Sequence, residues 1–387
     1  MIKKTLDYLG LRHAGGVELY FSLLLILSTY SFMGIRMEVI AWLLLFFILF
    51  FKKKARAKRT FVPLIVLATY ILVHDFLNLF IANGNINSFI MQIVYFVCMI
   101  NAVKVFNLEK LKGSINLVAI IAMIGLLYQW GIIAAGGYVR PIQIPFLEMA
   151  QARLEVLSIR PSSFFMEPAA YVAFMYIPLA FSLIEKKYIW TALIILSEFL
   201  TTSSTGVLTS FIMLFVYVMT QRVSLKIRLL TIVIGAAMFI SLFYVEAFQT
   251  SVNKLEETDV ESTVRLSQGP YVVSTMKWNE YIFGASYSSA YEYCHSGRAP
   301  LVIYYGKEVF LSTFWKMILL YGITGLFFYL LFYCKIVRKN KESLPLVACL
   351  IATMFSSGYG IGMNFVYTSI MLMLIMYRRD LSATTIN

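Results

Sequence analysis

Long apolar runs alternate with short charged or polar stretches along almost the whole chain. Each run holds roughly 16 to 25 mainly apolar residues, about the length that a helix needs to cross the hydrocarbon core of a bilayer. The pattern predicts an all-α polytopic membrane protein with about twelve transmembrane helices in one transmembrane domain, residues 1–387. The predicted spans are 17–33, 37–51, 60–81, 88–106, 115–135, 168–184, 188–203, 205–220, 229–246, 309–334, 344–359 and 362–377.

The composition excludes an ordinary water-soluble protein. Hydrophobic residues make up 60% of the chain and charged residues 14%, whereas soluble domains are about 45–50% apolar. The net charge of +13 is distributed between the apolar runs instead of forming one solvated basic face, so nucleic acid is not a predicted partner.

The basic residues instead predict the topology of the chain. With the N-terminus in the cytoplasm, most Lys and Arg fall in the cytoplasmic connections, for example in 52–59 and 335–341. This bias predicts that both termini are cytoplasmic. The Ser/Thr-rich break at 201–206 leaves open whether the number of spans is even or odd, because the spans on either side of it could form one interrupted helix.

Two outer segments are long, and function is expected on that face. The first long loop (residues 136–167) contains a stretch, 143–159, whose leucines recur at helical spacing, which predicts an amphipathic helix in the headgroup plane. The late loop (residues 247–308) is rich in aromatic residues and is also expected to hold short amphipathic helices. Loops of this size without a function are uncommon.

The motifs of soluble enzymes are absent from the sequence. There is no phosphate-binding loop, no dinucleotide fingerprint and no paired CxxC, and the three histidines do not form a pair at metal spacing. We therefore expect no metal and no cofactor. The remaining candidates are charged residues at the outer surface, where arginine suits phosphate because its planar fork donates two hydrogen bonds at once.

Arg160 and Glu167 flank the outer mouth of the span at 168–184, and Pro168 suits the first turn of that helix because its missing N–H needs no partner there. One interpretation makes both residues functional. The other is an interfacial Arg that reaches the headgroups and a Glu that favours the helix start.

Three more cations belong to the outer side. Arg265 and Arg298 lie in the late loop, and each is open to a solvated or a functional role. Lys316 lies about two turns into the run at 309–334. Burying an ammonium group there costs ~3 kcal/mol or more at mid-bilayer and less near the surface. Lys316 is therefore expected to face a polar cavity or to extend outward.

Two acids inside spans are further candidates. Asp75 follows His74, and Glu198 precedes the Ser/Thr-rich break. Intramembrane acids are functional candidates by default and would suit a proton-coupled transporter, although each could equally be half of an interhelical pair.

Together these features resemble the O-antigen polymerase (Wzy-type) and O-antigen ligase superfamily. The resemblance comprises an Arg-x-x-small-x-x-x-Glu-Pro motif, a Ser/Thr-rich break, a late loop that opens with Arg and closes with a hydrophobic-Gly turn, and a Ser, Leu, Gly, Gly pattern in the next span. The matching residues are Arg160, Ser163, Glu167, Pro168, Thr202 to Gly206, Arg265, Gly284, Ser312, Leu319, Tyr321, Gly322 and Gly325.

Two residues depart from the family pattern. Ser163 stands where a Gly is common, and the His that ligases place just before the equivalent of Ser312 is missing. The missing His favours a polymerase over a ligase.

The resemblance implies a C-type glycosyltransferase-like helical fold in the bacterial inner membrane, with the active site on the periplasmic face. The implied activity is polymerisation of undecaprenyl-diphosphate-linked oligosaccharides, with membrane lipid and a chain-length regulator protein as further candidate partners. By the same resemblance, Arg160 and Arg265 hold the diphosphate, and Glu167 is the acidic residue of the Glu-Pro motif.

The expected chemistry follows from these residue types. Fixed cations would stabilise the leaving diphosphate, and Glu167 would accept the proton of the attacking hydroxyl. Aromatic residues of the late loop would stack on sugar faces. The expected substrate-binding residues are Lys316, Arg298, Trp278, Tyr281 and Tyr287.

The alternatives that stay open are an O-antigen ligase-like transferase, a transporter or flippase of lipid-linked sugars, and a purely structural or binding role. No similarity between the two halves of the chain is visible, which counts against a secondary transporter, because such proteins usually bind their substrate between related halves.

Overall fold

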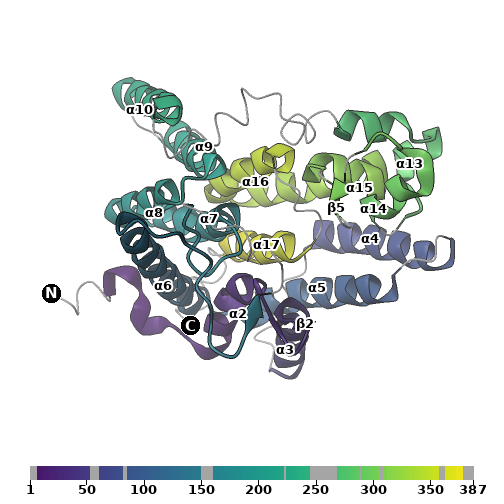
Figure 1. The fold of residues 1–387 in the computed structure, drawn as a ribbon, viewed down its shortest axis with the longest axis horizontal. Helices are drawn as coiled ribbons and strands as arrows, with labels where there is room; N and C mark the ends of the chain where they lie inside the picture. Colours follow the sequence, from purple (N-terminus) through teal and green to yellow (C-terminus); the bar gives the residue numbers. More distant parts are fainter. Residues whose placement is uncertain are drawn as a thin grey trace.

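The fold is mostly helical in the computed structural model (Figure 1). The described residues are 7–52, 61–81, 85–149, 160–221, 224–244, 268–287, 289–302, 304–305, 308–309, 311–356 and 362–377.

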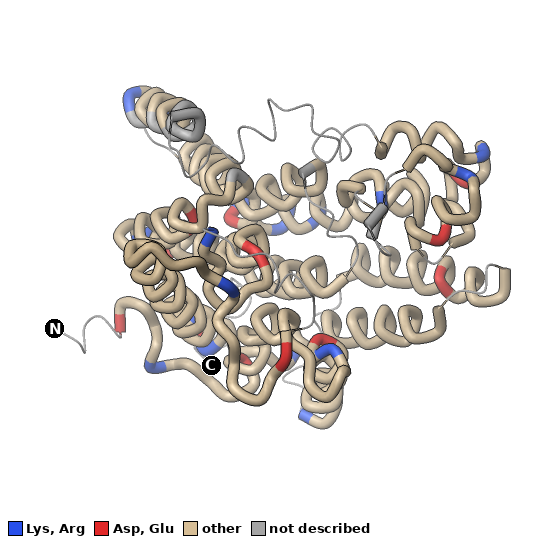
Figure 2. Tube along the Cα trace, viewed as in Figure 1, with Lys and Arg blue, Asp and Glu red and all other residues tan. Residues whose placement is uncertain are grey.

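A helix occupies each of the twelve ranges that the apolar pattern predicts, and the largest differences are that α2 ends six residues before 33 and α6 begins seven residues before 115. The helices are α2 Gly16–Leu27, α3 Met37–Phe51, α4 Val62–Ile81, α5 Ile86–Val105, α6 Leu108–Ala134, α7 Pro168–Ile184, α8 Tyr188–Leu200, α9 Ser204–Thr220, α10 Leu225–Tyr244, α15 Thr313–Lys339, α16 Leu344–Ser356 and α17 Met363–Met376. Figure 2 shows that most of their length carries no charged residue.

The described helices support a helical membrane protein. By length and composition, α4, α5, α6 and α15 are each long and apolar enough to cross a bilayer, and several other apolar helices are shorter. Twelve crossings therefore stay a prediction.

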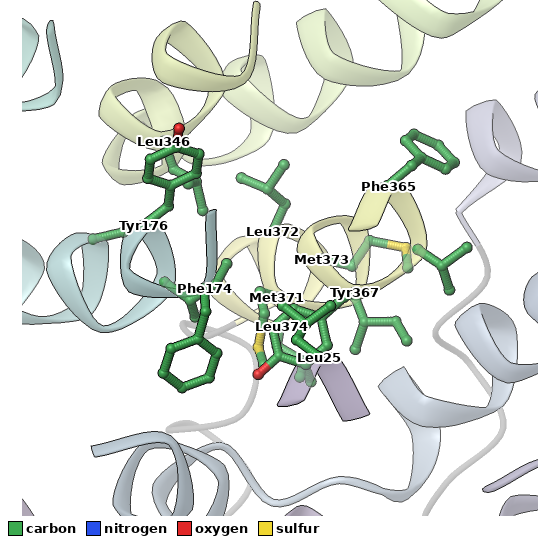
Figure 3. Packing of buried hydrophobic residues seen from close by; sticks show 14 of the residues in the cluster. Leu25, Phe174, Tyr176, Leu346, Phe365, Tyr367, Met371, Leu372, Met373 and Leu374 are labelled. Atoms are coloured by element: carbon green, nitrogen blue, oxygen red, sulfur yellow. The ribbon is translucent and has the colours of Figure 1, made fainter. Parts of the chain in front are cut away.

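The last helix, α17, forms the centre of the core. Every residue from Phe365 to Met376 is buried, although the helix is only moderately long. Figure 3 shows its side chains among Phe174 and Tyr176 of α7 and Leu25 of α2. A helix that is apolar on all sides can be buried on all sides, which explains why this run carries no polar face.

Polar contacts join segments that the charge pattern assigns to the same side. On the predicted cytoplasmic side, Lys112 of α6 and Lys187 both pair with Glu185 after α7, the latter at 2.7 Å. Burial raises the pKa of Glu185, but hydrogen bonds from the two lysines outweigh it, and the pKa is lowered. On the opposite side, the Tyr30 hydroxyl after α2 donates to the carbonyl oxygen of Phe164 at 3.2 Å.

The Ser/Thr-rich break separates two helices that fold back on each other. Gly206 and Ser210 of α9 both lie against Glu198 of α8, and the Ser210 hydroxyl donates to its carboxylate. A continuous helix would place residues 198 and 210 about 18 Å apart. The break is therefore a turn between two helices that contact each other and not a point within one continuous helix.

A small sheet departs from a purely helical fold. The connection between α2 and α3 is a hairpin of β1 (Tyr30–Phe32) and β2 (Ile35–Arg36), and β3 (Glu148–Met149) pairs with the other edge of β1. Met33 and Gly34 at its tip both have positive φ, as a tight hairpin turn requires. The sheet ties the first long loop to the α2–α3 connection.

The predicted amphipathic helix at 143–159 is wrong for its described part. Residues 143–149 form a turn followed by β3, and 150–159 lie outside the described residues. Pro145 has no N–H to donate within a helix, and Phe146 has φ +67°. The open edge of β1 supplies hydrogen-bond partners for the backbone of 148–149. In the predicted helix, those partners would have come from within the segment.

The late loop contains the short helices that the sequence predicts. They include 268–274, α13 (Trp278–Phe283) and α14 (Ala290–Tyr293), followed by a single wide turn, η3 (Cys294–Arg298), and the hairpin of β4 (Tyr304–Tyr305) with β5 (Glu308–Val309). The loop has a small apolar core of its own. Its members include Val272, Ala285, Tyr293, Leu311 and Leu319, so the loop packs on the start of α15.

Candidate functional site

Gln129 of α6 fixes the described part of the first long loop. Its side chain is buried, and its Oε1 accepts from the backbone N–H groups of Ser162 (2.9 Å) and Ser163 (2.7 Å). Its Nε2 donates to the carbonyl oxygen of Arg140 at 2.6 Å. Leaving such groups unpaired costs about 1–3 kcal/mol each. One glutamine therefore holds the described segments on either side of residues 150–159.

Ser163 and Thr202 both have left-handed backbone conformations, with φ +56° and +54°. This region suits glycine, and a β-branched residue such as Thr rarely occupies it. A glycine would adopt the conformation of Ser163 without strain. Each strained residue costs about 1–3 kcal/mol, and such strain is concentrated at functional sites.

Arg160 joins the arginine motif to the Ser/Thr-rich break. Its Nη2 donates to the carbonyl oxygen of Thr202 at 3.3 Å. Beside it, the Trp130 indole N–H of α6 donates to the carbonyl oxygen of Leu200 at 2.8 Å. Two motif segments 42 residues apart in sequence are therefore in direct contact where α6 and α8 end and α7 and α9 begin.

Several polar atoms in this region are buried without a partner. Among the described residues, Ser163 Oγ, Thr202 Oγ1 and Glu198 Oε1 make no hydrogen bond. Glu198 is fully buried, and its backbone oxygen accepts from the Thr201 hydroxyl at 2.7 Å. Unsatisfied buried polar atoms are rare in folded proteins. We call Gln129, Arg160, Ser163, Glu198 and Thr202 the Arg160 cluster.

Glu167 lies at the N-cap position of α7. Its backbone oxygen accepts from the N–H of Ala170 at 3.0 Å, and its half-buried side chain does not cap the helix. Pro168 is the first helical residue, as the sequence predicts. The Glu167 carboxylate thus lies at the N-terminus of α7 but does not cap the helix.

Lys316 lies closer to the helix end than the sequence predicts. Ser312 is the N-cap of α15, and the N–H of Lys316 donates to its carbonyl oxygen at 3.0 Å. Lys316 is therefore in the first turn, and the expected depth of two turns is wrong. Val309 belongs to β5, and Leu311 lies between β5 and α15. Hydropathy does not distinguish such apolar residues from those of a helix.

Arg298 forms a two-pronged ion pair with Glu280 of α13. Its Nη1 and Nη2 lie 2.5 Å and 2.9 Å from the two carboxylate oxygens, and its guanidinium lies 5.1 Å from the centre of the Tyr293 ring. Burial raises the pKa of Glu280, but hydrogen bonds from Arg298 and the Lys277 N–H outweigh it, so this pKa is lowered. The Glu280 hydrogen bonds raise the pKa of Arg298. The guanidinium of Arg298 is thus engaged in linking η3 to α13.

The three candidate aromatic residues have different surroundings. Trp278 is 77% exposed. Tyr281 is half-buried against the main core, whereas Tyr287 packs on the core of the late loop, with its ring 5.2 Å from Tyr293. Trp278 therefore presents the most open face for a sugar.

A break within α15 receives the hydrophobic-Gly turn of the late loop. Gly322 has φ +67° and Gly284 has φ +95°, and each approaches backbone atoms of the other segment so closely that a Cβ would lie 2.2 Å from a carbonyl oxygen. The N–H of Ala285 donates to the carbonyl oxygen of Leu319 at 2.7 Å. Two further residues that match the family pattern are therefore in contact.

Polar side chains of α4 lie beside this break. The Tyr70 hydroxyl lies 2.8 Å from the carbonyl oxygen of Tyr321 and 3.1 Å from that of Phe283. Asp75 Oδ2 lies 3.5 Å from the Tyr321 hydroxyl, and its Oδ1 lies 3.8 Å from His74 Nδ1. We call Tyr70, Asp75, Gly284, Tyr321 and Gly322 the Gly322 break.

Arg265 lies outside the described residues, so its convergence with Arg160 stays a prediction. Within the part of the chain that the structure describes, no three His, Cys, Asp or Glu side chains are grouped as metal ligands would be.

No protein-family model matches the chain, and a search of curated proteins finds no match either. The resemblance to the O-antigen polymerase and ligase superfamily therefore stays a prediction from the motif residues.

Sequence reasoning did not identify Gln129, Gly125 or Tyr30, which position the first long loop. The Cβ of an alanine at Gly125 would lie 2.4 Å from Ser163 Oγ. The only sequence signal was a polar residue and a glycine within an apolar run, and that signal does not say which segment packs on them.

Proposed function

We propose that this chain polymerises oligosaccharide repeat units carried on undecaprenyl diphosphate. A sugar hydroxyl of one lipid-linked unit bonds to the anomeric carbon of the growing glycan. The bond from that carbon to the diphosphate oxygen breaks, and the diphosphate leaves with the electron pair. The hydroxyl proton passes to a base.

The proposed setting is the bacterial inner membrane, with about twelve spans in a C-type glycosyltransferase-like fold. Both termini are cytoplasmic, and the Arg160 cluster faces the periplasm, where membrane lipid surrounds it and a chain-length regulator protein is a candidate partner. The positive-inside bias supports this orientation, and the contacts within each predicted side are compatible with it.

The hydrogen bond from Arg160 to Thr202 is the observation that carries the proposal. It brings the arginine motif to the Ser/Thr-rich break, next to buried oxygens that lack partners among the described residues. A guanidinium beside available hydroxyl groups suits a phosphate, because phosphate accepts hydrogen bonds from both.

Arg160, together with Arg265, stabilises the negative charge that develops on the leaving diphosphate. Removing one such preorganised donor typically lowers the rate about 10²–10³-fold. Glu167 accepts the proton of the attacking hydroxyl, and because diphosphate leaves without protonation, no separate acid is required.

The test is the length of the surface polysaccharide made by variant strains. Arg160→Ala is expected to reduce chain extension by about 10²-fold or more, leaving mainly single repeat units. Arg160→Lys is expected to be impaired as well, because a point charge does not reproduce the planar fork. Arg140→Ala is the matched control, since it removes an exposed arginine from the same loop and should leave full-length polymer.

Each strain also needs a measurement of the membrane level of the protein. Full-length polymer from the Arg160→Ala strain would refute the site assignment, as would an equal loss in the Arg140→Ala strain at equal protein levels.

A transporter or flippase is the second candidate, and the Gly322 break favours it. Broken helices beside intramembrane polar groups form substrate sites in many transporters, and Asp75 and His74 lie at this break. A strain without the gene separates the two functions. Single repeat units on the lipid A core would indicate lost polymerisation, whereas no repeat units at all would indicate lost flipping or ligation.

A further inference from the structure

The first part of α15 is a short helix with a buried N-terminus. The break at Gly322 separates residues 313–321 from the remainder of α15. Leu311, Ser312 and Thr313 are all buried where this half-helix begins. Trp315 in its first turn lies against Gly269 of the late loop, so the loop covers the helix start.

Ser312 occupies the N-cap position without acting as a cap. Its backbone has the extended conformation of an N-cap (φ −66°, ψ 159°), yet its side chain accepts no hydrogen bond from the first turn. A serine at this position ordinarily accepts from the second or third N–H of the helix. Ser312 is only 2% exposed, and its Oγ has no hydrogen-bond partner in the described part of the chain.

Lys316 adds a cation to this turn. A positive charge in the first turn opposes the helix dipole and is therefore destabilising there. An anion bound at the helix start would make the electrostatic energy of this turn favourable. It interacts favourably with the dipole, with the lysine and with the first N–H groups at once. The buried hydroxyl of Ser312 supplies a further donor at the same turn.

This turn is separate from the Arg160 cluster. α16 packs on α9 on one side and on α15 on the other (Figure 1), and Phe355 near its end stacks on Phe314 at 4.9 Å. A helix with its side chains is about 10 Å wide. The first turn of α15 and the Arg160 cluster therefore lie on different sides of α16, and the proposal gives each its own anion.

We propose that Ser312, Lys316 and the first-turn N–H groups of α15 form a second phosphate site, which binds the diphosphate of the acceptor substrate. The assignment to the acceptor rests on the proposed function, because each extension step uses two lipid diphosphates, one on the growing glycan and one on the incoming unit. The Arg160 cluster then holds the first and α15 the second.

Binding of farnesyl diphosphate and of inorganic pyrophosphate to the purified full-length chain in detergent tests the proposal. Wild-type protein is expected to bind two molecules of farnesyl diphosphate, and Arg160→Ala and Lys316→Gln one each. At the α15 site, Lys316→Gln should weaken binding about tenfold or more, and Ser312→Ala by a smaller factor of about three to ten. Lys277→Gln, an exposed lysine of the late loop, is the matched control and should change neither site.

Phosphatidylglycerol added as a competitor identifies the source of the phosphate. The proposal expects it to compete far less well than farnesyl diphosphate, and equal competition would overturn the assignment by indicating a lipid headgroup site. Unchanged stoichiometry in Lys316→Gln, or equal weakening by Lys277→Gln, would also overturn it. Ser312→Ala removes a single oxygen, so it keeps the test decisive if Lys316→Gln does not fold.

Binding and chain extension separate the two proposals. Loss of one diphosphate site in Lys316→Gln supports the second site even if the strain without the gene still makes polymer. Loss of polymer in Arg160→Ala with unchanged stoichiometry in Lys316→Gln leaves the proposed function standing and refutes the second site.

Discussion

The Arg160 cluster and the Gly322 break are both places where helices are interrupted, but they are held together differently. At the break, backbone groups have partners: the Ala285 N–H donates to the carbonyl oxygen of Leu319, and the Tyr70 hydroxyl donates to that of Tyr321. In the Arg160 cluster, side chains hold the loop, and Ser163 and Thr202 retain hydroxyls without partners among the described residues.

The difference distinguishes a structural contact between two segments, at the Gly322 break, from a candidate binding site, at the Arg160 cluster. Satisfied backbone contacts rigidify a fold and leave little for a ligand to bind. Strained residues with available polar atoms are kept where they serve a function. The comparison therefore favours the Arg160 cluster as the candidate binding site, whereas the late loop docks on α15 at the Gly322 break.

The largest effect is expected at the break. Gly322→Ala would place a Cβ 2.2 Å from the Ile282 carbonyl oxygen in a left-handed conformation, and backbone cannot move aside cheaply. We expect a loss of about 3 kcal/mol or more. Gly297→Ala, also at positive φ but with open space around it, should lose only about 1 kcal/mol. Thermal unfolding of the purified variants measures both, and equal losses would contradict the role of the close contact.

The next effect concerns the helix under the first long loop. Gly125→Ala would bring a Cβ within 2.4 Å of Ser163 Oγ, displacing the loop that carries Arg160, and about 2 kcal/mol of stability and most chain extension should be lost. Gly131→Ala in the same helix meets open space and should be neutral or slightly stabilising. Adding Ser163→Gly to Gly125→Ala should restore part of the loss. If the double variant recovers no stability and no chain extension, the close contact with Ser163 is not the cause of the loss.

A smaller effect is expected on how the stability of the late loop depends on pH. Because the pKa of Glu280 is lowered in the folded chain, its pairing with Arg298 stabilises the loop above the unfolded pKa of about 4.3 and is lost as the pH falls through the folded value. Glu280→Gln should lower stability by about 1 kcal/mol at neutral pH and flatten this acid dependence. Limited proteolysis of the loop from pH 7 down to about 2 follows this loss. An unchanged acid profile in the variant would show that other groups control the loop.

The smallest effect has the opposite sign. Ser163→Gly alone should stabilise the chain by about 0.5–1 kcal/mol, because glycine adopts the left-handed conformation without strain and the lost hydroxyl has no described partner. Unfolding temperature reports the gain, and a loss would indicate that the hydroxyl is used in the folded protein.

The positions of the helices were predictable, whereas short-range details were not. Apolar runs marked all twelve helices, yet the helix expected at 143–159 is a turn and a strand in its described part, because β1 offers an open edge. Lys316 was placed too deep because strand and link residues before α15 are as apolar as the helix.

The sequence by itself determined where the chain is helical and which connections are basic. In an apolar environment a helix satisfies its backbone within its own segment, so that information is local. Only the tertiary structure decided that Gln129 holds Ser163, that Arg160 meets Thr202 and that Gly284 meets Gly322. These contacts join residues far apart in sequence, and they depend on how whole helices pack, which no local pattern of residues specifies.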